Sequence, residues 1–357
     1  MSLYVGNTEV KNLYYGNKQV SAYCNGEWIW PNAPQAYSIT YTKNSGMYEV
    51  AGPTSAYPGQ TVYFAATPGP YQTFSGLTVN GQTAAKEYSF VMPSGNATVN
   101  VVGTDAASAI TYGEVVFQFN TPSNFNPKTK WGKFSSKWTR ISTSPNIWKF
   151  TAIDDCDVDL YYMFGGGTGD VAGLTDWEIL YGNMPAFNSV GGIFSWNAGL
   201  KKVHYLCVNG ASTDTYSLFD SCSNLTEAHI TLCNTYGMNT WFNDCSALKT
   251  VSVGDINNET YDRYNDKMIV NEIGDMFYGC SALKYLPIMK FNGNLYNADR
   301  TFMECPNVEG GIVSAYNRIT ADNNDVSHRG TFKYCGANTS AGSAELAQIP
   351  ASWKEDE

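Results

Sequence analysis

The segment Met276-Phe277-Tyr278-Gly279-Cys280-Ser281-Ala282-Leu283-Lys284-Tyr285-Leu286 carries a spacing that recurs along the second half of the chain. A phenylalanine is followed three positions later by a cysteine, three later by a leucine, and then by two apolar residues at intervals of three and two. Four copies follow this template, the last with two substitutions: Phe219-Cys222-Leu225-Ala228-Ile230, Phe242-Cys245-Leu248-Val251-Val253, Phe277-Cys280-Leu283-Leu286-Ile288 and Phe302-Cys305-Val308-Gly311-Val313. The chain therefore contains an internal repeat.

Partial copies extend the repeat at both ends. Upstream, Phe194-Asn197-Leu200-Val203-Tyr205 fits with asparagine in the cysteine position, and Leu174-Trp177-Ile179 matches the second half alone. Downstream, Phe332 and Cys335 match the first half. The intervals of three are typical of a helical turn and the final interval of two is typical of a strand, so each copy is predicted to be a short helical turn that leads into a short strand.

A unit of this size cannot bury its own apolar side, which predicts that successive copies stack into a solenoid with one continuous core. The rings of Phe219, Phe242, Phe277 and Phe302 should then lie one above another inside the coil. The repeat cysteines should form a ladder of small buried thiols. Because these cysteines lie 23 to 35 residues apart, the return loops vary in length on a constant core, as binding surfaces often do.

The run from Met276 to Leu286 resembles the BspA-type leucine-rich repeats of bacterial and phage surface proteins, over roughly residues 150–350. This resemblance implies a right-handed solenoid that serves adhesion or recognition and has no associated catalytic residues. The chain departs from the pattern at Asn197, at Gly311 and in the long insert after Val253, which leaves the curvature open.

Composition excludes several classes of protein. The 357 residues have a formal net charge of −10 and no block of lysine or arginine, so nucleic-acid binding is not expected. No apolar run is long enough for a membrane span, and the first residues do not look like a signal peptide. The nine cysteines are odd in number and contain no Cys-x-x-Cys pair, so neither zinc nor another cofactor is expected.

Residues 1–31 carry a shorter repeat in which Gly6-Asn7, Gly16-Asn17 and Asn25-Gly26 separate short apolar runs. Such pairs predict tight β-hairpins. About thirty residues cannot form a stable core alone, so this module should dock either on the next domain or on another chain. It resembles the amino-terminal modules of phage tail and head-fibre proteins, which implies attachment to other virion proteins.

Three further regions follow the linker at 31–34. Residues 36–103 contain five predicted strands, at 37–41, 61–65, 77–79, 88–92 and 97–102, and resemble a divergent internalin B-type repeat, which implies a β-grasp-like module. Residues 110–164, with strands expected at 114–119 and 147–151, are interpreted as the cap of the solenoid, because its first unit needs cover. The solenoid is assigned to 165–353, and 354–357 should be frayed.

Three groups of residues could suggest a catalytic or ligand-binding site, but each has a simpler explanation. The three histidines, His204, His229 and His328, show no spacing typical of a catalytic triad. Asp155, Asp157 and Asp159 could bind calcium from one face of a strand, but a solvated edge that discourages strand pairing is the favoured interpretation. The glycine-rich loop at 165–170 lacks the Gly-Lys-Ser ending of a phosphate site. We therefore predict that the protein is not an enzyme.

Binding residues are predicted in two groups, although many of the aromatic ones could instead pack between units. The first group alternates with the buried strand residues and should form an exposed ribbon, and the second comprises aromatic residues of the return segments. The first is His204, His229, Thr231, Ser252, Pro287 and Ser314, and the second is Tyr236, Trp241, Tyr261, Tyr264, Tyr285 and Tyr296.

The sequence thus predicts a mainly β protein with short helices: a hairpin module, a β-grasp-like domain and a capped leucine-rich-repeat solenoid. The expected function is that of a phage fibre or adhesin, part of the virion, that recognises a host-surface glycan or protein, with homo-oligomers such as trimers expected. The alternatives are a bacterial cell-surface adhesin and a purely structural head or tail accessory. A glycan depolymerase would require paired carboxylates that the repeats lack.

Overall fold

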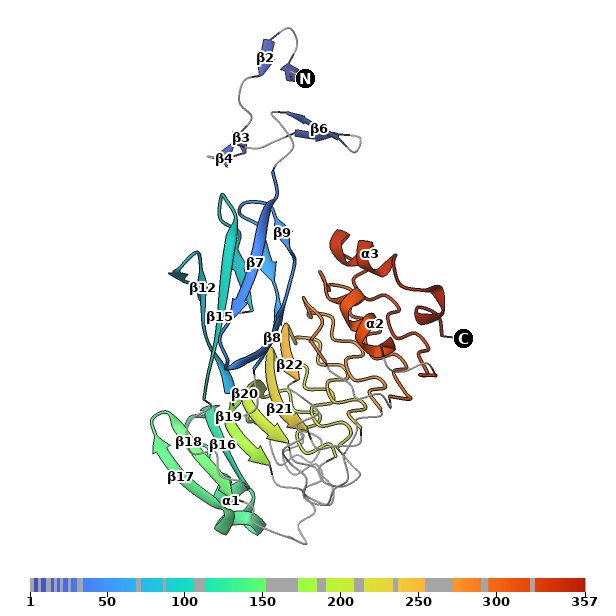
Figure 1. The fold of residues 1–357 in the computed structure, drawn as a ribbon. Coiled ribbons are helices and arrows are strands. Elements are labelled where there is room, and N and C mark those ends of the chain that lie inside the picture. The colour runs from blue at the N-terminus through green and yellow to red at the C-terminus, as the bar shows by residue number, and fades with distance from the viewer. Residues whose placement is uncertain are drawn as a thin grey trace.

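The computed structural model describes the backbone of short strands within residues 3–30, and then residues 35–68, 72–85, 88–105, 113–151, 173–184, 191–208, 215–233, 237–253, 272–289, 295–321 and 325–356. The protein is mainly β, with a few short helices and several sheets (Figure 1). The predicted fold class is confirmed at this level.

The amino-terminal segment contains antiparallel strand pairs, as predicted. They are β1 (Leu3–Val5) with β2 (Thr8–Val10), β3 (Tyr14–Tyr15) with β4 (Lys18–Gln19), and β5 (Ala22–Cys24) with β6 (Glu27–Trp30). Each pair brackets one of the Gly-Asn or Asn-Gly dipeptides of the sequence. Two-stranded hairpins of this size are marginally stable alone.

The described residues between 35 and 105 form a β domain with its own core. Its strands are β7 (Tyr37–Lys43), β8 (Met47–Ala51), β9 (Ser55–Ala56), β10 (Thr61–Tyr63), β11 (Ala65–Pro68), β12 (Gln72–Val79), β13 (Gln82–Thr83), β14 (Ser89–Val91) and β15 (Ala97–Asp105). The five predicted strands correspond to β7, β10, β12, β14 and β15, while β8, β9, β11 and β13 were missed. Val99 and Val101 of β15 are fully buried between β12, its antiparallel neighbour, and β7, which pairs in parallel. We call this unit the β domain.

A seven-stranded sheet joins the predicted cap to the repeats. Its order is β17 (Trp138–Thr143), β18 (Asn146–Thr151), β16 (Glu114–Thr121), β19 (Asp176–Met184), β20 (Leu200–Val208), β21 (Glu227–Cys233) and β22 (Thr250–Val253). The pairs from β17 to β19 are antiparallel and those from β19 to β22 are parallel. Two short helices, α1 (Pro127–Lys130) and η1 (Gly132–Lys137), carry Trp131 into stacked contact with Trp138. The cap therefore shares one core with the repeats.

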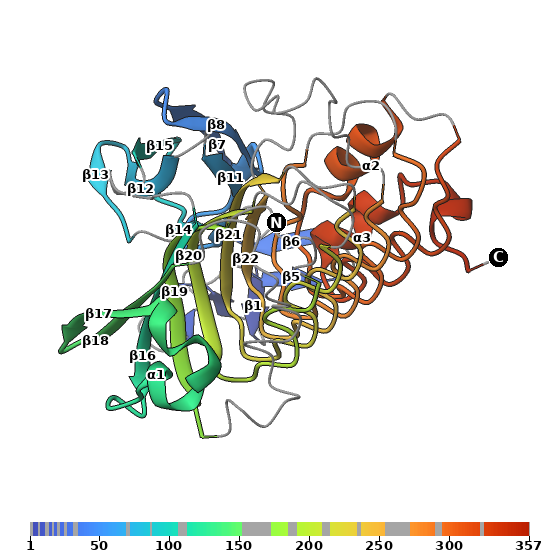
Figure 2. The same cartoon turned by 90° about the horizontal axis from the view of Figure 1, so that it is seen from below.

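The stacking of the repeat phenylalanines is confirmed. The rings of Phe194, Phe219, Phe242, Phe277, Phe302 and Phe332 follow one another with centroids 5.3 to 5.5 Å apart and planes within 18° of parallel. All six are buried, and Figure 2 shows the turns that carry them lying side by side. Offset-stacked ring pairs add about 0.5–1.5 kcal/mol per pair beyond the burial of the side chains.

The turns around these rings are not helical, which corrects the predicted helical turn. In every turn the residues two before and two after the phenylalanine have φ between 53° and 72°, the left-handed region. Glycine holds some of these positions, but Thr240, Asp275 and Arg300 hold others, and non-glycine residues are uncommon there. The left-handed residues turn the intervening peptide groups so that they bond to the next turn.

The resulting backbone ladder is regular. The N–H groups two residues before, at, and two residues after each phenylalanine from Phe194 to Phe302 donate to carbonyl groups of the following turn, at 2.7 to 3.2 Å. For Phe277 the donors Asp275, Phe277 and Gly279 bond to Asp299, Thr301 and Met303. The peptide groups of successive turns are therefore aligned in one direction along the stack.

The cysteine ladder has a role beyond compact packing. The thiols of Cys222, Cys245, Cys280 and Cys305 each donate to the carbonyl oxygen of the phenylalanine one turn earlier, at 3.1 Å. All are free and buried, and burial raises their pKa values, to about 12 for Cys222 and Cys305. Asn197, in the cysteine position of the first turn, instead accepts from the Trp177 indole and the Gly199 amide.

We expect Cys280→Ala to lower the free energy of unfolding by about 1–2 kcal/mol, because it removes both packed volume and the bond to the Phe242 carbonyl. The matched control is the neighbouring Ser281→Ala, whose hydroxyl contacts Ser246 at the surface and which should change stability by less than about 0.5 kcal/mol. Urea denaturation of both variants measures the difference. Equal stabilities would show that the thiol ladder contributes nothing.

The last repeats depart from the template. Tyr285 and Gly310 form only an isolated parallel bridge, and after Gly311 the chain enters α2 (Ile312–Thr320) rather than the predicted strand. α3 (Ser340–Leu346) and η3 (Ala351–Trp353) then close the stack. The tail is not frayed as predicted: Phe332 N–H donates to Trp353 O at 2.9 Å, Gly330 N–H donates to Glu355 O, and Lys333 pairs with Asp356.

Candidate functional site

The strand side of the stacked turns is covered by the β domain. β11 packs against β22 (Figure 2), and the Tyr88 ring stacks on His229 with centroids 4.9 Å apart. His229 is consequently only 7% exposed and Ser252 only 2%. The prediction that these two residues belong to an exposed ribbon is wrong. Their side chains point away from the core of the repeats, as predicted, but the β domain covers them.

A buried polar cluster lies at this interface. His229 Nδ1 lies 3.2 Å from Tyr88 Oη and 2.8 Å from Ser252 Oγ, and Nε2 lies 2.9 Å from Glu227 Oε1. Lys202 Nζ is 3.3 Å from the other oxygen of Glu227. Burial alone would raise the pKa of Glu227, but the hydrogen bond from His229 and the nearby positive charges outweigh it and lower the pKa to about 2.

The contact between the β domain and the repeats continues along the stack. Lys284 Nζ lies 5.7 Å from the centre of the Tyr63 ring, and Arg318 of α2 pairs with Glu49 of β8. Burial and the nearby Tyr285 hydroxyl raise the pKa of Tyr41. The β domain therefore contacts the strand side from β21 to α2, and this side is occupied within the chain itself.

The remaining predicted binding residues are dispersed. His204 is partly exposed and pairs with Glu178 at 2.7 Å, Tyr285 is partly buried near Gly310, and Tyr296 is exposed. Pro287 is buried, so its predicted place on the exposed ribbon is also wrong. Ser314 lies on α2, where its hydroxyl contacts Arg318. Thr231 lies on β21, and its side chain is outside the description. Tyr236, Tyr261, Tyr264 and the aspartates Asp155, Asp157 and Asp159 lie outside the described residues.

Trp241 is fully buried, so its predicted place on a binding surface is wrong. Its indole packs edge-on against Phe242, at 6.4 Å between ring centres. The position before each stacked phenylalanine is buried in every turn. It is apolar in the first four turns, as at Ile193, Leu218 and Met276, and threonine in the last two. This apolar row was visible in the sequence and would have placed Trp241 correctly.

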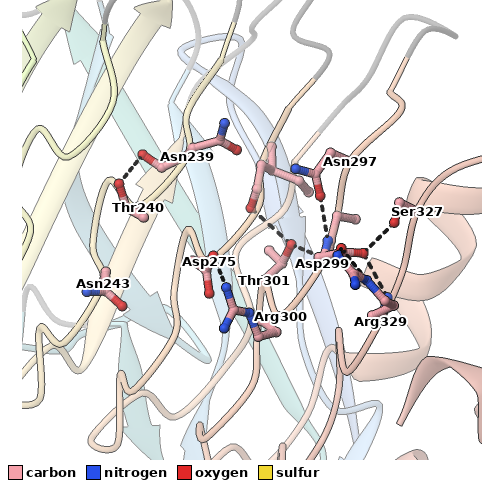
Figure 3. A network of polar contacts seen from close by, with 12 residues as sticks. Asn239, Thr240, Asn243, Asp275, Asn297, Asp299, Arg300, Thr301, Ser327 and Arg329 are labelled. Atoms are coloured by element: carbon pink, nitrogen blue, oxygen red, sulfur yellow. Dashed lines mark hydrogen bonds and ion pairs between the residues drawn. The ribbon is translucent and has the colours of Figure 1, made fainter. Parts of the chain in front are cut away.

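The exposed surface of the turns carries a row of polar side chains. We use the name turn edge for a set of side chains around each stacked phenylalanine. It includes the positions from three residues before to two residues after the phenylalanine, except those buried in the core. Figure 3 shows its central part, where Arg300 donates to Asp275 at 3.0 Å and Asp299 accepts from Ser327, from the Arg329 amide and from Arg329 Nε at 2.7 to 2.9 Å. Burial opposes ionisation of Asp299, yet these hydrogen bonds lower its pKa.

Exposed aromatic rings lie at both ends of the turn edge. Trp196 in the first described turn is 59% exposed and Tyr334 in the last is 55% exposed. Both stand two residues after their phenylalanine, in the left-handed conformation. Large exposed aromatic residues are favoured at binding surfaces because they supply contact area at low entropic cost. Sequence reasoning missed both, although comparison of equivalent positions across the repeats would have grouped them.

The described part of the chain contains no group of three or more histidine, cysteine, aspartate or glutamate side chains arranged to hold a metal ion. Within the same residues, no helix has the length and apolar character of a membrane span. The arrangement offers a long edge of hydrogen-bonding groups and terminal aromatic rings, which can bind a partner through many separate contacts.

Comparison of the chain with protein-family models, curated proteins and solved structures finds no match.

Proposed function

We propose that this chain is a non-catalytic virion fibre or adhesin protein that recognises a glycan or protein on the host surface. The stacked turns would form a leucine-rich-repeat solenoid of the BspA-like kind, and the turn edge would carry recognition. The amino-terminal hairpins would attach the chain to other virion proteins. A bacterial cell-surface adhesin is the alternative, with the same surface in the same role.

The observation that carries this proposal is that one side of the stack is covered by another domain and the other side is exposed. The β domain covers the strand side through Tyr88, Tyr63 and Glu49. The turn edge, by contrast, exposes rings at Trp196 and Tyr334 and polar groups between them. A surface with repeated donors and acceptors suits recognition by many weak contacts.

Weak contacts become effective when several copies are displayed together, because binding of one copy raises the local concentration of the others. The hairpins support such display. Each pair is too small to be stable alone, so docking on a second copy or on a larger assembly would stabilise it. A homo-oligomer, such as a trimer, is therefore part of the proposal.

The test is a pull-down of the full chain on envelopes of the host bacterium, combined with electron microscopy of virions labelled against the chain. The double variant Trp196→Ala/Tyr334→Ala should reduce envelope binding at least about tenfold, as loss of aromatic anchors commonly does. Tyr57→Ala is the matched control, since Tyr57 is also an exposed aromatic residue but lies on the β domain. Undiminished binding by the double variant would contradict a role for the turn edge, and virion labelling without envelope binding would leave a purely structural role.

A further inference from the structure

A cavity of about 270 Å³ opens on the turn edge near the carboxyl-terminal end of the stack, lined by Asp299, Arg300, Arg329 and Asp356. The first three residues lie two or three positions before Phe302 and Phe332, and Asp356 comes from the tail that closes the stack. Two of the five arginines of the whole chain thus meet at one cavity in a protein of net charge −10.

The two guanidinium groups retain unused donors within the described structure. Arg300 donates to Asp275 through Nη2 alone, and Arg329 contacts Asp299 through Nε and Nη2. Each keeps its Nη1 group for a ligand, and the side chains are 53% and 65% exposed. Asp299, in contrast, is mostly buried and accepts at both oxygens. Asp299 therefore holds Arg329 in position, and the Nη1 group of Arg329 remains open to the cavity.

Arg300 is held in place by its backbone. It has φ of 53°, where the equivalent positions of other turns have glycine, serine, threonine or aspartate. The conformation is common to every turn, and Arg300 is the residue that places a long cationic side chain at this position. Its N–H also donates to the Arg329 carbonyl at 2.8 Å, so both arginines are tied to the same rung of the backbone ladder.

The charges around the cavity select the kind of ligand. Arg300, Arg329 and Lys333 pair with Asp275, Asp299 and Asp356, and Glu304 adds a negative charge near Lys333. A dianion such as phosphate would find no net positive charge, whereas a single carboxylate can use the planar guanidinium donors. Hydroxyl groups on the same ligand can donate to Asp356, which is half-exposed. The cavity, just below the size of sites for drug-sized ligands, suits one sugar ring.

We infer that this cavity binds a saccharide residue that carries a carboxylate, of the uronic or sialic acid class, with Arg300 and Arg329 as the carboxylate ligands. The inference rests on the proposed function, because it specifies which component of a host-surface glycan the turn edge recognises. It adds a named subsite and a chemical preference to that function.

The test is titration of the full chain with methyl glucuronide and with N-acetylneuraminic acid, followed by ligand-observed NMR and calorimetry. Methyl glucoside, which lacks the carboxylate, and inorganic phosphate are the comparison ligands. We expect at least one of the two acids to bind at least about tenfold more tightly than methyl glucoside and more tightly than phosphate, since charge-assisted guanidinium bonds dominate the site. Equal binding of acid and glucoside, tighter binding of phosphate, or no binding of either acid would overturn the inference.

The variants separate the site from the fold. Asparagine tolerates the left-handed conformation. Arg300→Asn should therefore weaken binding of the acid at least about tenfold with little change in melting temperature. Asp275→Asn removes the carboxylate that competes for Arg300 and should tighten binding of the acid. Lys249→Gln removes an exposed charge on another turn and should have no effect. A loss of acid binding with Lys249→Gln equal to that with Arg300→Asn would point to net charge rather than to this cavity.

Envelope pull-down distinguishes this inference from the proposed function. If neither acid binds but envelope binding persists, the cavity is not the subsite and the recognition role stands. If an acid binds at the cavity but the chain does not bind envelopes, the site exists and the proposed host-binding role fails.

Discussion

Phe277→Ala is expected to lower the free energy of unfolding by about 3–5 kcal/mol, the largest effect of any single substitution considered. The ring is fully buried and stacks on both sides, 5.4 Å from Phe242 and 5.5 Å from Phe302. The alanine would leave a cavity bounded by neighbouring turns whose backbones are bonded to each other, so collapse around it is restricted. Urea denaturation followed by circular dichroism measures the loss.

The control for this variant is Tyr296→Ala, which removes an exposed aromatic ring one turn away and should change stability by less than about 0.5 kcal/mol. Because the turns form one shared core, we expect Phe277→Ala to destabilise the cap and the repeats together. A cost below about 1 kcal/mol would contradict the central role of the ring ladder.

The folded protein is expected to lose stability in acid at the buried cluster around Glu227. The folded pKa of Glu227 is about 2, below its ordinary value of 4.5. A depressed pKa contributes stability that is fully present above about pH 4.5 and is lost as the pH falls toward 2. The difference between these values corresponds to about 3 kcal/mol. Stability measured by urea denaturation between pH 2 and pH 6 should therefore fall along this range.

Glu227→Gln should flatten that acid dependence, because glutamine has no proton to gain over this range. Glu178→Gln is the matched control: Glu178 also pairs with a histidine and has a lowered pKa, but it lies on β19, two strands away from the Tyr88 contact on β21. Its substitution should leave most of the pH dependence in place. An unchanged acid profile in Glu227→Gln would place the dependence on other carboxylates.

Much of the core followed from local spacing, and most of the errors came from distant contacts. The three-residue intervals placed Phe219, Phe242 and Phe277 correctly because the same side chain recurs at the same step of every turn. His229 was misplaced because its neighbour Tyr88 is 141 residues away. Arg318 and Glu49, 269 residues apart, show the same limitation. The repeat pattern specifies what faces inward, and it carries no information about which domain covers the outside.

The spacing of the repeat also did not predict the backbone conformation of the turns. Intervals of three fit a helical turn as well as they fit a left-handed bend, and only the Gly192, Gly279 and Gly330 positions hinted at the second. The turn-edge arginines were missed for a related reason. Arg300 and Arg329 belong to different repeats and have no shared motif, so the stacking must be known before they can be placed at one cavity.

The aligned peptide groups give the stack two chemically different ends. At its carboxyl-terminal end the amides of Gly330 and Phe332 emerge from the last turn, and the carbonyls of Glu355 and Trp353 terminate the ladder. A chain shortened before residue 350 would expose these amides as a template with a defined polarity. The closing tail therefore supplies the acceptors that a following turn would otherwise provide.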